Sequence, residues 1–197
     1  MTTRMLDLGG TARVSVDPDW LCTEAAERLQ RDLVRQLRWE QRDVVLFGRR
    51  VSQPRLIAWC GELGYRYSGQ TLEPRAAPGA LAEVLARVVR ETGTEFNHVL
   101  VNRYRDGNDG MGLHADDEPE LGPDPVVASL SLGATRRFVL RPRNRKHPPL
   151  SVELESGTLL VMHAGTQASH RHGIPKTTRP VGERLSLTFR RLLRAPG

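Results

Sequence analysis

Two stretches in the first half of the chain carry apolar residues at every third or fourth position, as on one face of a helix. The first runs from Thr23 to Trp39, and its apolar positions are Ala26, Leu29, Leu33 and Leu37. The second runs from Pro78 to Thr92, and its apolar positions are Leu81, Val84, Leu85, Val88 and Val89. We expect Thr23 to cap the first helix and Gly93 to end the second. The pattern therefore predicts two helices with one buried face each.

From Glu95 onward the pattern changes to short apolar runs separated by glycine, proline and aspartate. Six of these runs are predicted to be strands: Phe96–Tyr104, Pro125–Leu132, Arg137–Leu140, Ser151–Leu154, Thr158–Met162 and Leu185–Leu193. Segment 141–150 is basic and contains proline, so we expect a surface loop there. Because the helices precede the strands, the order predicts an α+β domain whose second half is an antiparallel sandwich or barrel.

Length and composition narrow the class of protein. A chain of 197 residues suffices for one domain with a sizeable core. It contains no run of roughly 18 apolar residues that would span a membrane, and its N-terminus lacks the apolar segment of a signal peptide. We therefore expect a cytoplasmic protein without a membrane partner. The net charge of +6 favours a polyanionic partner such as nucleic acid, although genome composition can also produce an excess of arginine.

Three residues can form a metal site. In an extended segment, residues two positions apart point to the same side, so His114 and Asp116 can present an imidazole and a carboxylate to one ion. A third ligand must come from a distant strand, and both His170 and His172 are candidates. Two histidines and one carboxylate leave three coordination positions open, which suits a non-haem Fe(II) oxygenase.

The C-terminal strand alternates strictly between apolar and polar residues. One face carries Leu185, Leu187 and Phe189, and the other carries Arg184, Ser186, Thr188 and Arg190. The polar face is either exposed to solvent or lines a cavity, where two guanidinium groups can hold a dicarboxylate. An earlier strand places Asn102 and Tyr104 on one face, so these two side chains can reach one ligand together.

In order and spacing, these segments resemble the AlkB family of DNA and RNA repair dioxygenases. The resemblance rests on Asn102-Arg103-Tyr104, His114-Ala115-Asp116-Asp117-Glu118-Pro119, residues 128–136, Gly157-Thr158-Leu159-Leu160, His172-Gly173-Ile174-Pro175 and Arg184-x-x-x-Thr188-Phe189-Arg190. It extends upstream through Phe47-Gly48, Pro54-Arg55 and Tyr65-Arg66-Tyr67-Ser68-Gly69, and so covers about residues 44–193. The similarity looks strongest to the branch that contains the human DNA-repair homologues.

The resemblance implies a single dioxygenase domain over residues 1–197, built on a double-stranded β-helix, or jelly-roll. In this scheme, residues 1–43 are an N-terminal extension with the first helix, and residues 44–77 are a substrate lid. Residues 78–94 are the second helix, and residues 95–193 are the jelly-roll core. We expect a monomer.

The resemblance also assigns the ligands of the cofactors. It makes His114, Asp116 and His172 the ligands of Fe(II), because the sequence after His172 matches the family context better than that after His170. It makes Asn102, Tyr104, Arg184, Ser186, Thr188 and Arg190 the residues that bind 2-oxoglutarate. In this scheme Arg190 binds the distal carboxylate and Arg184 lies nearer the metal. Ser186 departs from the asparagine that is usual in the family, and His163 and His170 are expected to be structural or solvated.

For the substrate, the resemblance implies dealkylation of bases such as 1-methyladenine and 3-methylcytosine in DNA, with RNA as an alternative. Carbon dioxide, succinate and an aldehyde would be formed from 2-oxoglutarate, O2 and the alkylated base. The expected substrate residues are Phe47, Gly48, Arg55, Tyr65, Tyr67 and Asp117. Phe47 would enter the base stack as a wedge, unless it is a core residue, and Asp117 would face a cationic base. The rival hypothesis is an Fe(II)/2-oxoglutarate hydroxylase that acts on a protein, lipid or small molecule.

Overall fold

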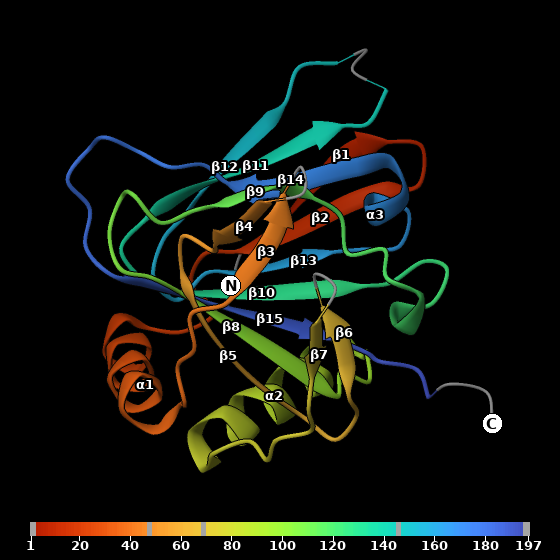
Figure 1. The fold of residues 1–197 in the computed structure, drawn as a ribbon. Helices are drawn as coiled ribbons and strands as arrows, with labels where there is room; N and C mark the ends of the chain where they lie inside the picture. Colours follow the sequence, from red (N-terminus) through yellow and green to blue (C-terminus); the bar gives the residue numbers. More distant parts are fainter. Residues whose placement is uncertain (1–2, 47–48, 68–69, 145–146, 195–197) are drawn as a thin grey trace.

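The computed structural model describes residues 3–46, 49–67, 70–144 and 147–194. Its main feature is a seven-stranded antiparallel sheet that faces a four-stranded antiparallel sheet (Figure 1). The large sheet consists, in spatial order, of β1 (Arg4–Gly9), β2 (Ala12–Asp17), β13 (Leu159–Met162), β10 (Val127–Gly133), β15 (Arg184–Arg190), β8 (His98–Tyr104) and β5 (Leu56–Gly61). The small sheet consists of β12 (Leu150–Leu154), β11 (Arg136–Pro142), β14 (His170–Ile174) and β9 (Met111–His114). This arrangement confirms the predicted α+β class with a jelly-roll core.

Two helices cover the face of the large sheet that points away from the small sheet (Figure 1). They are α1 (Thr23–Gln36) and α2 (Gly79–Thr92), and the predicted apolar stripes pack against the outer side chains of the sheet. Helix α2 ends at Gly93, whose φ of 67° is left-handed, as expected for a glycine stop. The predicted cap of α1 is wrong: Cys22 occupies the N-cap position, and no side chain caps this helix.

Each of the six predicted strands overlaps an observed strand, but several further strands were not predicted. The hairpin of β1 and β2 extends the large sheet at one edge, and β5 forms the opposite edge. Strand β5 therefore belongs to the sandwich, although it lies within the segment that was expected to be a lid. Two hairpins, β3 (Asp43–Leu46) with β4 (Arg49–Ser52) and β6 (Tyr65–Tyr67) with β7 (Gln70–Leu72), also lie in that segment.

The core between the two sheets contains apolar side chains together with the polar face of β15. Side chains from both sheets form the apolar part, among them Val127 of β10, Phe138 of β11 and Ile174 of β14. All seven residues of β15 are buried, so its polar face points into the sandwich and not into solvent. The remaining described helices are the 3-10 turn Pro119–Leu121 and the short α3 (Thr166–Ser169). No described helix is long and apolar enough to cross a membrane.

Candidate metal centre

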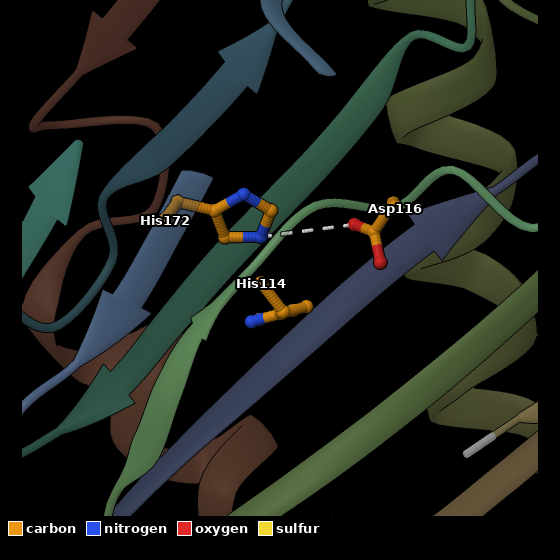
Figure 2. A group of neighbouring side chains, drawn as sticks. All are labelled: His114, Asp116 and His172. Carbon is orange, nitrogen blue, oxygen red and sulfur yellow. Dashed lines mark ion pairs between the residues drawn. The ribbon is translucent and has the colours of Figure 1, made fainter. Parts of the chain in front are cut away.

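The ends of two neighbouring strands bring two histidines and one aspartate together. In the small sheet, His172 of β14 pairs with His114 of β9, and Asp116 follows directly after β9. One ligand atom of each residue lies within 4.8 Å of the others, and the three side chains approach a common point (Figure 2). The imidazole rings are 4.4 Å apart, and Nε2 of His172 is 3.8 Å from Oδ2 of Asp116. His170 does not belong to this group.

The protonation states of these residues suit a cation. Burial alone would raise the pKa of Asp116, but Arg190 and the two histidines outweigh it and hold the pKa at about 2. Burial, assisted by the neighbouring His114, lowers the pKa of His172 to about 3. At neutral pH the group therefore offers one carboxylate and two neutral imidazoles, which are the forms that bind a metal ion.

Neighbouring groups orient two of the three ligands. Nδ1 of His114 lies 3.0 Å from the carbonyl oxygen of Gly112, and because a carbonyl only accepts, Nδ1 carries the proton and Nε2 is left for a metal. Buried Gln167, on α3, accepts a hydrogen bond of 3.0 Å from the backbone N–H of Asp116. The side chain of Asp116 is held by Arg190, which donates a hydrogen bond of 2.7 Å to Oδ1 of Asp116.

One oxygen of this arrangement supports a bound metal ion directly. Oδ2 of Asp116 is completely buried and has no hydrogen-bond partner among the described residues. A buried carboxylate oxygen without a partner is costly, and a divalent cation held between Asp116, His114 and His172 would satisfy it. The two-histidine, one-carboxylate set therefore fits Fe(II).

A cavity next to the three ligands contains most of the residues predicted to bind the cosubstrate. Its lining includes His114 and His172 together with Asn102, Tyr104, Ser186, Thr188 and Arg190. Strands β8 and β15 supply the last five of these, and their register sets Ser186 opposite Asn102. The three candidate metal ligands and a polar cavity thus lie next to each other between the two sheets.

A buried positive charge lies beside this cavity. Arg184 is fully buried and donates one hydrogen bond, of 2.8 Å, to Oγ of Ser131. Its Nε and one terminal nitrogen have no hydrogen-bond partner among the described residues. Burial lowers the pKa of Arg184 to about 10, so the group stays charged at neutral pH. An anion bound beside Arg184 would supply a partner for these nitrogens.

Residues 13–190 match the 2OG-Fe(II) oxygenase superfamily. The chain belongs to this family. Its cofactors are accordingly Fe(II), 2-oxoglutarate and O2.

Individual relatives agree with the resemblance read from the sequence. The chain is 38% identical over 193 residues to human alpha-ketoglutarate-dependent dioxygenase alkB homolog 3, covering 92% of this chain and 66% of that protein. It is 42% identical over 159 residues to mouse DNA oxidative demethylase ALKBH2, covering 76% and 66%. The chain thus spans just under two thirds of the length of these relatives. The solved structure of OsALKBH1 has the same fold, with a TM-score of 0.66 and 17% identity, covering 95% of this chain and all of that one.

The structure corrects the predicted order of the two strand arginines. Arg190 donates to Asp116 and therefore lies at the metal end of the cavity. Arg184 lies at the other end, opposite Tyr104 in the register of β15 and β8. The structure therefore places Arg190, and not Arg184, next to the metal ligands. The alternation of the strand defines which residues share a face, but it contains no information about which end of the strand meets the metal.

Ser186 has a partner that the sequence did not indicate. Its Oγ lies 3.2 Å from Oγ of Ser129 on the neighbouring strand β10, and both residues line the cavity. The short hydroxyl is therefore engaged within the sheet.

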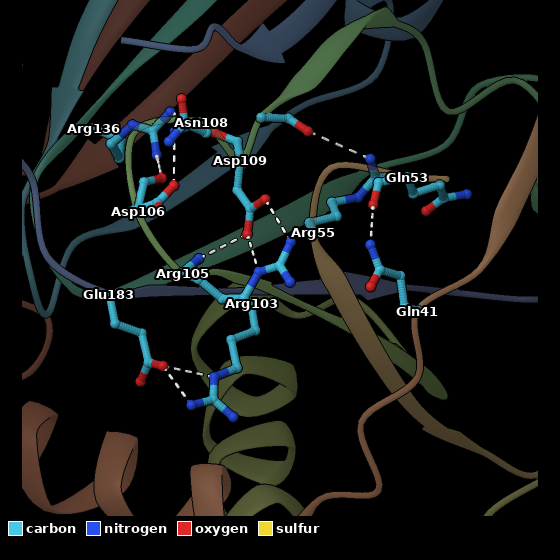
Figure 3. Close-up of polar contacts among 11 residues, drawn as sticks. Gln41, Gln53, Arg55, Arg103, Arg105, Asp106, Asn108, Asp109, Arg136 and Glu183 are labelled. Atoms are coloured by element: carbon cyan, nitrogen blue, oxygen red, sulfur yellow. Dashed lines mark hydrogen bonds and ion pairs between the residues drawn. The ribbon is translucent and has the colours of Figure 1, made fainter. Parts of the chain in front are cut away.

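Arg55, one of the residues expected to bind the substrate, contacts other residues of the protein in this structure. Arg55 is buried, and its Nε donates to Oδ1 of Asn102 at 2.8 Å, while a terminal nitrogen donates to the carbonyl of Gly110 at 3.4 Å. Figure 3 shows Arg55 among the polar residues beneath the loop between β8 and β9. Arg136 fixes the same loop by donating to the carbonyls of Asp106 and Asp109. Arg55 therefore holds the oxygen of Asn102, which leaves the amide NH2 of Asn102 as the donor for a ligand in the cavity.

Two of the predicted substrate residues that the structure describes lie in different surroundings. Tyr65 is completely buried and contacts the ring of His98 edge-on at 5.0 Å, so a base cannot reach it in this structure. Asp117 is exposed and forms an ion pair of 2.6 Å with Arg143. Phe47, Gly48 and the side chain of Tyr67 lie outside the described residues.

The other histidines have local partners. The ring of His170 lies 2.9 Å from Oγ of Ser169, and that of His163 lies 2.9 Å from Oγ of Ser15. These contacts agree with the structural roles expected for both. Two supporting residues, Gln167 and Arg143, were missed by sequence reasoning, because each acts on a partner that is distant in the chain.

Proposed function

We propose that this oxygenase removes alkyl groups from damaged bases in DNA. The observation that carries the proposal is that the metal ligands lie against a cavity lined by polar residues of β8 and β15, in a chain similar over 92% of its length to a protein named as an alkB homologue. Asp117 supports the choice of a base as substrate, because a carboxylate at the rim of the site favours the cationic bases 1-methyladenine and 3-methylcytosine.

The residues of the chain hold and orient the reactants. His114, Asp116 and His172 would hold the iron, while Arg184 would hold the distal carboxylate of 2-oxoglutarate. When bound, iron and O2 supply the oxidation, in which one oxygen atom enters a C–H bond of the alkyl group and the other enters succinate as CO2 leaves. The hydroxylated carbon then separates from the base nitrogen as an aldehyde.

Electrostatics around Asp116 prepare the site for this reaction. Arg190 engages Oδ1 of Asp116 and leaves Oδ2 directed toward the metal position. Gln167 fixes the backbone of the same residue. The ligand is thereby held in one orientation before the metal binds, which reduces the reorganisation needed when the reactants assemble.

The proposal is tested by measuring succinate and formaldehyde with purified protein, Fe(II) and 2-oxoglutarate. The substrates are oligonucleotides of one sequence with 1-methyladenine or 3-methylcytosine, as single- and double-stranded DNA and as RNA. Formation of both products with DNA, and of neither with Asp116→Ala, is the expected result. Preference for RNA would change the substrate class. Succinate formation only with a protein, lipid or small molecule would replace the proposal with the rival hydroxylase function.

A further inference from the structure

Asp117 is held by an arginine that is itself anchored. A terminal nitrogen of Arg143 lies 2.6 Å from Oδ2 of Asp117 and donates at 3.2 Å to the carbonyl of Gln167. The backbone N–H of Arg143 donates to the carbonyl of Ser169 at 2.9 Å. Both carbonyls belong to α3, so this short helix fixes the guanidinium in front of Asp117.

The pair lies at the rim of the metal centre. Asp117 directly follows the ligand Asp116 in the chain. Arg143 contacts the backbone carbonyl of Gln167, and the side chain of Gln167 accepts a hydrogen bond from the backbone N–H of Asp116. The side chains of Arg143 and Asp117 are 35% and 61% exposed, so solvent and salt screen their interaction. The Asp117 carboxylate is therefore accessible to a further molecule while Arg143 is still bound to it.

We infer that Arg143 sets how strongly the enzyme distinguishes cationic from neutral damaged bases. This inference rests on the proposed function, in which Asp117 attracts a cationic base. A guanidinium beside the same carboxylate compensates part of its negative charge and competes with the base for its oxygens. Arg143 thus lowers the advantage of cationic lesions and keeps neutral lesions within the substrate range. It is a positioning residue that acts through Asp117.

The experiment compares two lesions in otherwise identical single-stranded DNA at pH 7 and one low salt concentration. One is 1-methyladenine, which is cationic, and the other is 3-methylthymine, which is neutral. The measured quantity is the ratio of kcat/KM for the cationic lesion to that for the neutral one. In Arg143→Gln we expect this ratio to rise roughly two- to fivefold, the range for a partly exposed ion pair. Raising the salt concentration should reduce the difference between variant and wild type.

Three further variants isolate the effect. Arg141→Gln removes the same charge from an exposed position in β11, two residues before Arg143. It should change kcat/KM for both lesions by the same factor, so the ratio should not change. Arg143→Lys keeps the charge, so its ratio should stay near that of the wild type. When Asp117 is already replaced by Asn, Arg143→Gln should leave the ratio unchanged, because the carboxylate through which Arg143 acts is absent.

An unchanged or lower ratio in Arg143→Gln, with the wild type active on both lesions, overturns the inference and leaves the proposed function intact. A rise of the same size in Arg141→Gln also overturns it, because the effect would then belong to net charge. If the wild type dealkylates neither lesion, the proposed function itself fails. Thermal melting of each variant checks the fold, and Arg143→Met, which keeps the aliphatic stem, replaces Arg143→Gln if the latter does not fold.

Discussion

Replacing Arg184 with methionine should have opposite effects on the stability of the protein and on the binding of its cosubstrate. The guanidinium is fully buried, and two of its nitrogens have no partner among the described residues. Methionine has a similar length and flexibility but no charge. The variant therefore removes a buried cation without opening a large cavity.

The two effects differ in sign because the charge lacks a partner only in the absence of the dicarboxylate. Exchanging a buried charged group for an apolar one is often neutral or stabilises a protein by about 1–4 kcal/mol, so the melting temperature without ligands should stay the same or rise. Loss of a buried charge-assisted pair costs about 2–5 kcal/mol, so the Kd for 2-oxoglutarate should rise roughly 30-fold or more.

The assay is calorimetric titration of the Mn(II)-loaded protein with 2-oxoglutarate and with 2-oxobutanoate, which lacks the distal carboxylate. The wild type should bind 2-oxoglutarate far more tightly, whereas Arg184→Met should bind the two acids with similar affinity. A variant that keeps the preference for 2-oxoglutarate would refute the reasoning. If Arg190→Met removes the preference and Arg184→Met does not, the two arginines have been assigned to the wrong ends of the cavity.

Three further predictions follow from other parts of the molecule. His172→Ala should abolish metal binding, measured by titration with Mn(II), and turnover, whereas His170→Ala should retain both; the reverse result would make His170 the third ligand. Burial, assisted by Arg190, lowers the pKa of His98 from 6.5 to about 3. Because the folded-state pKa lies below the unfolded one, the stabilisation from neutral His98 is present above pH 6.5 and is lost as the pH falls toward 3, at up to about 1.4 kcal/mol per pH unit. In urea unfolding, His98→Phe should therefore lose less stability between pH 7 and 5 than the wild type, and equal losses would contradict the assignment. Phe47→Ala should reduce repair of a methylated base in duplex DNA more than in single-stranded DNA at the same low salt concentration, since only the duplex must be unstacked; equal losses with a lower melting temperature would make Phe47 a core residue.

The sequence predicted those features of the site that depend on the local geometry of one strand. The alternation from Arg184 to Arg190 separates the polar face of β15 from its apolar face, because side chains in a strand point alternately to two sides. The spacing of His114 and Asp116 relies on the same geometry. The choice of His172 as the third ligand relied on the resemblance to the family. The pairing of β14 with β9, which brings His172 to His114, is a contact across 58 positions of the chain.

What the sequence could not predict depends on burial and on strand direction. Arg55 was expected to contact the substrate, yet the sandwich buries it against Asn102. Tyr65 was expected in a lid and instead packs in a core cluster beside Trp59. Strands β9 and β14 were missed because each is short and contains a glycine, which lowers the strand signal.

The position of β9 has a consequence for how the enzyme loses its metal. This strand of four residues forms the edge of the small sheet, pairs only with β14 among the described strands, and does so across an irregularity between His172 and Ile174. Edge strands with few backbone hydrogen bonds are among the first segments to open locally, and His114 moves with this one. We therefore expect metal release to be coupled to local opening of β9. Amide hydrogen exchange at Met111–His114 should be slower when Mn(II) is bound, and its rate should follow the rate of Mn(II) dissociation.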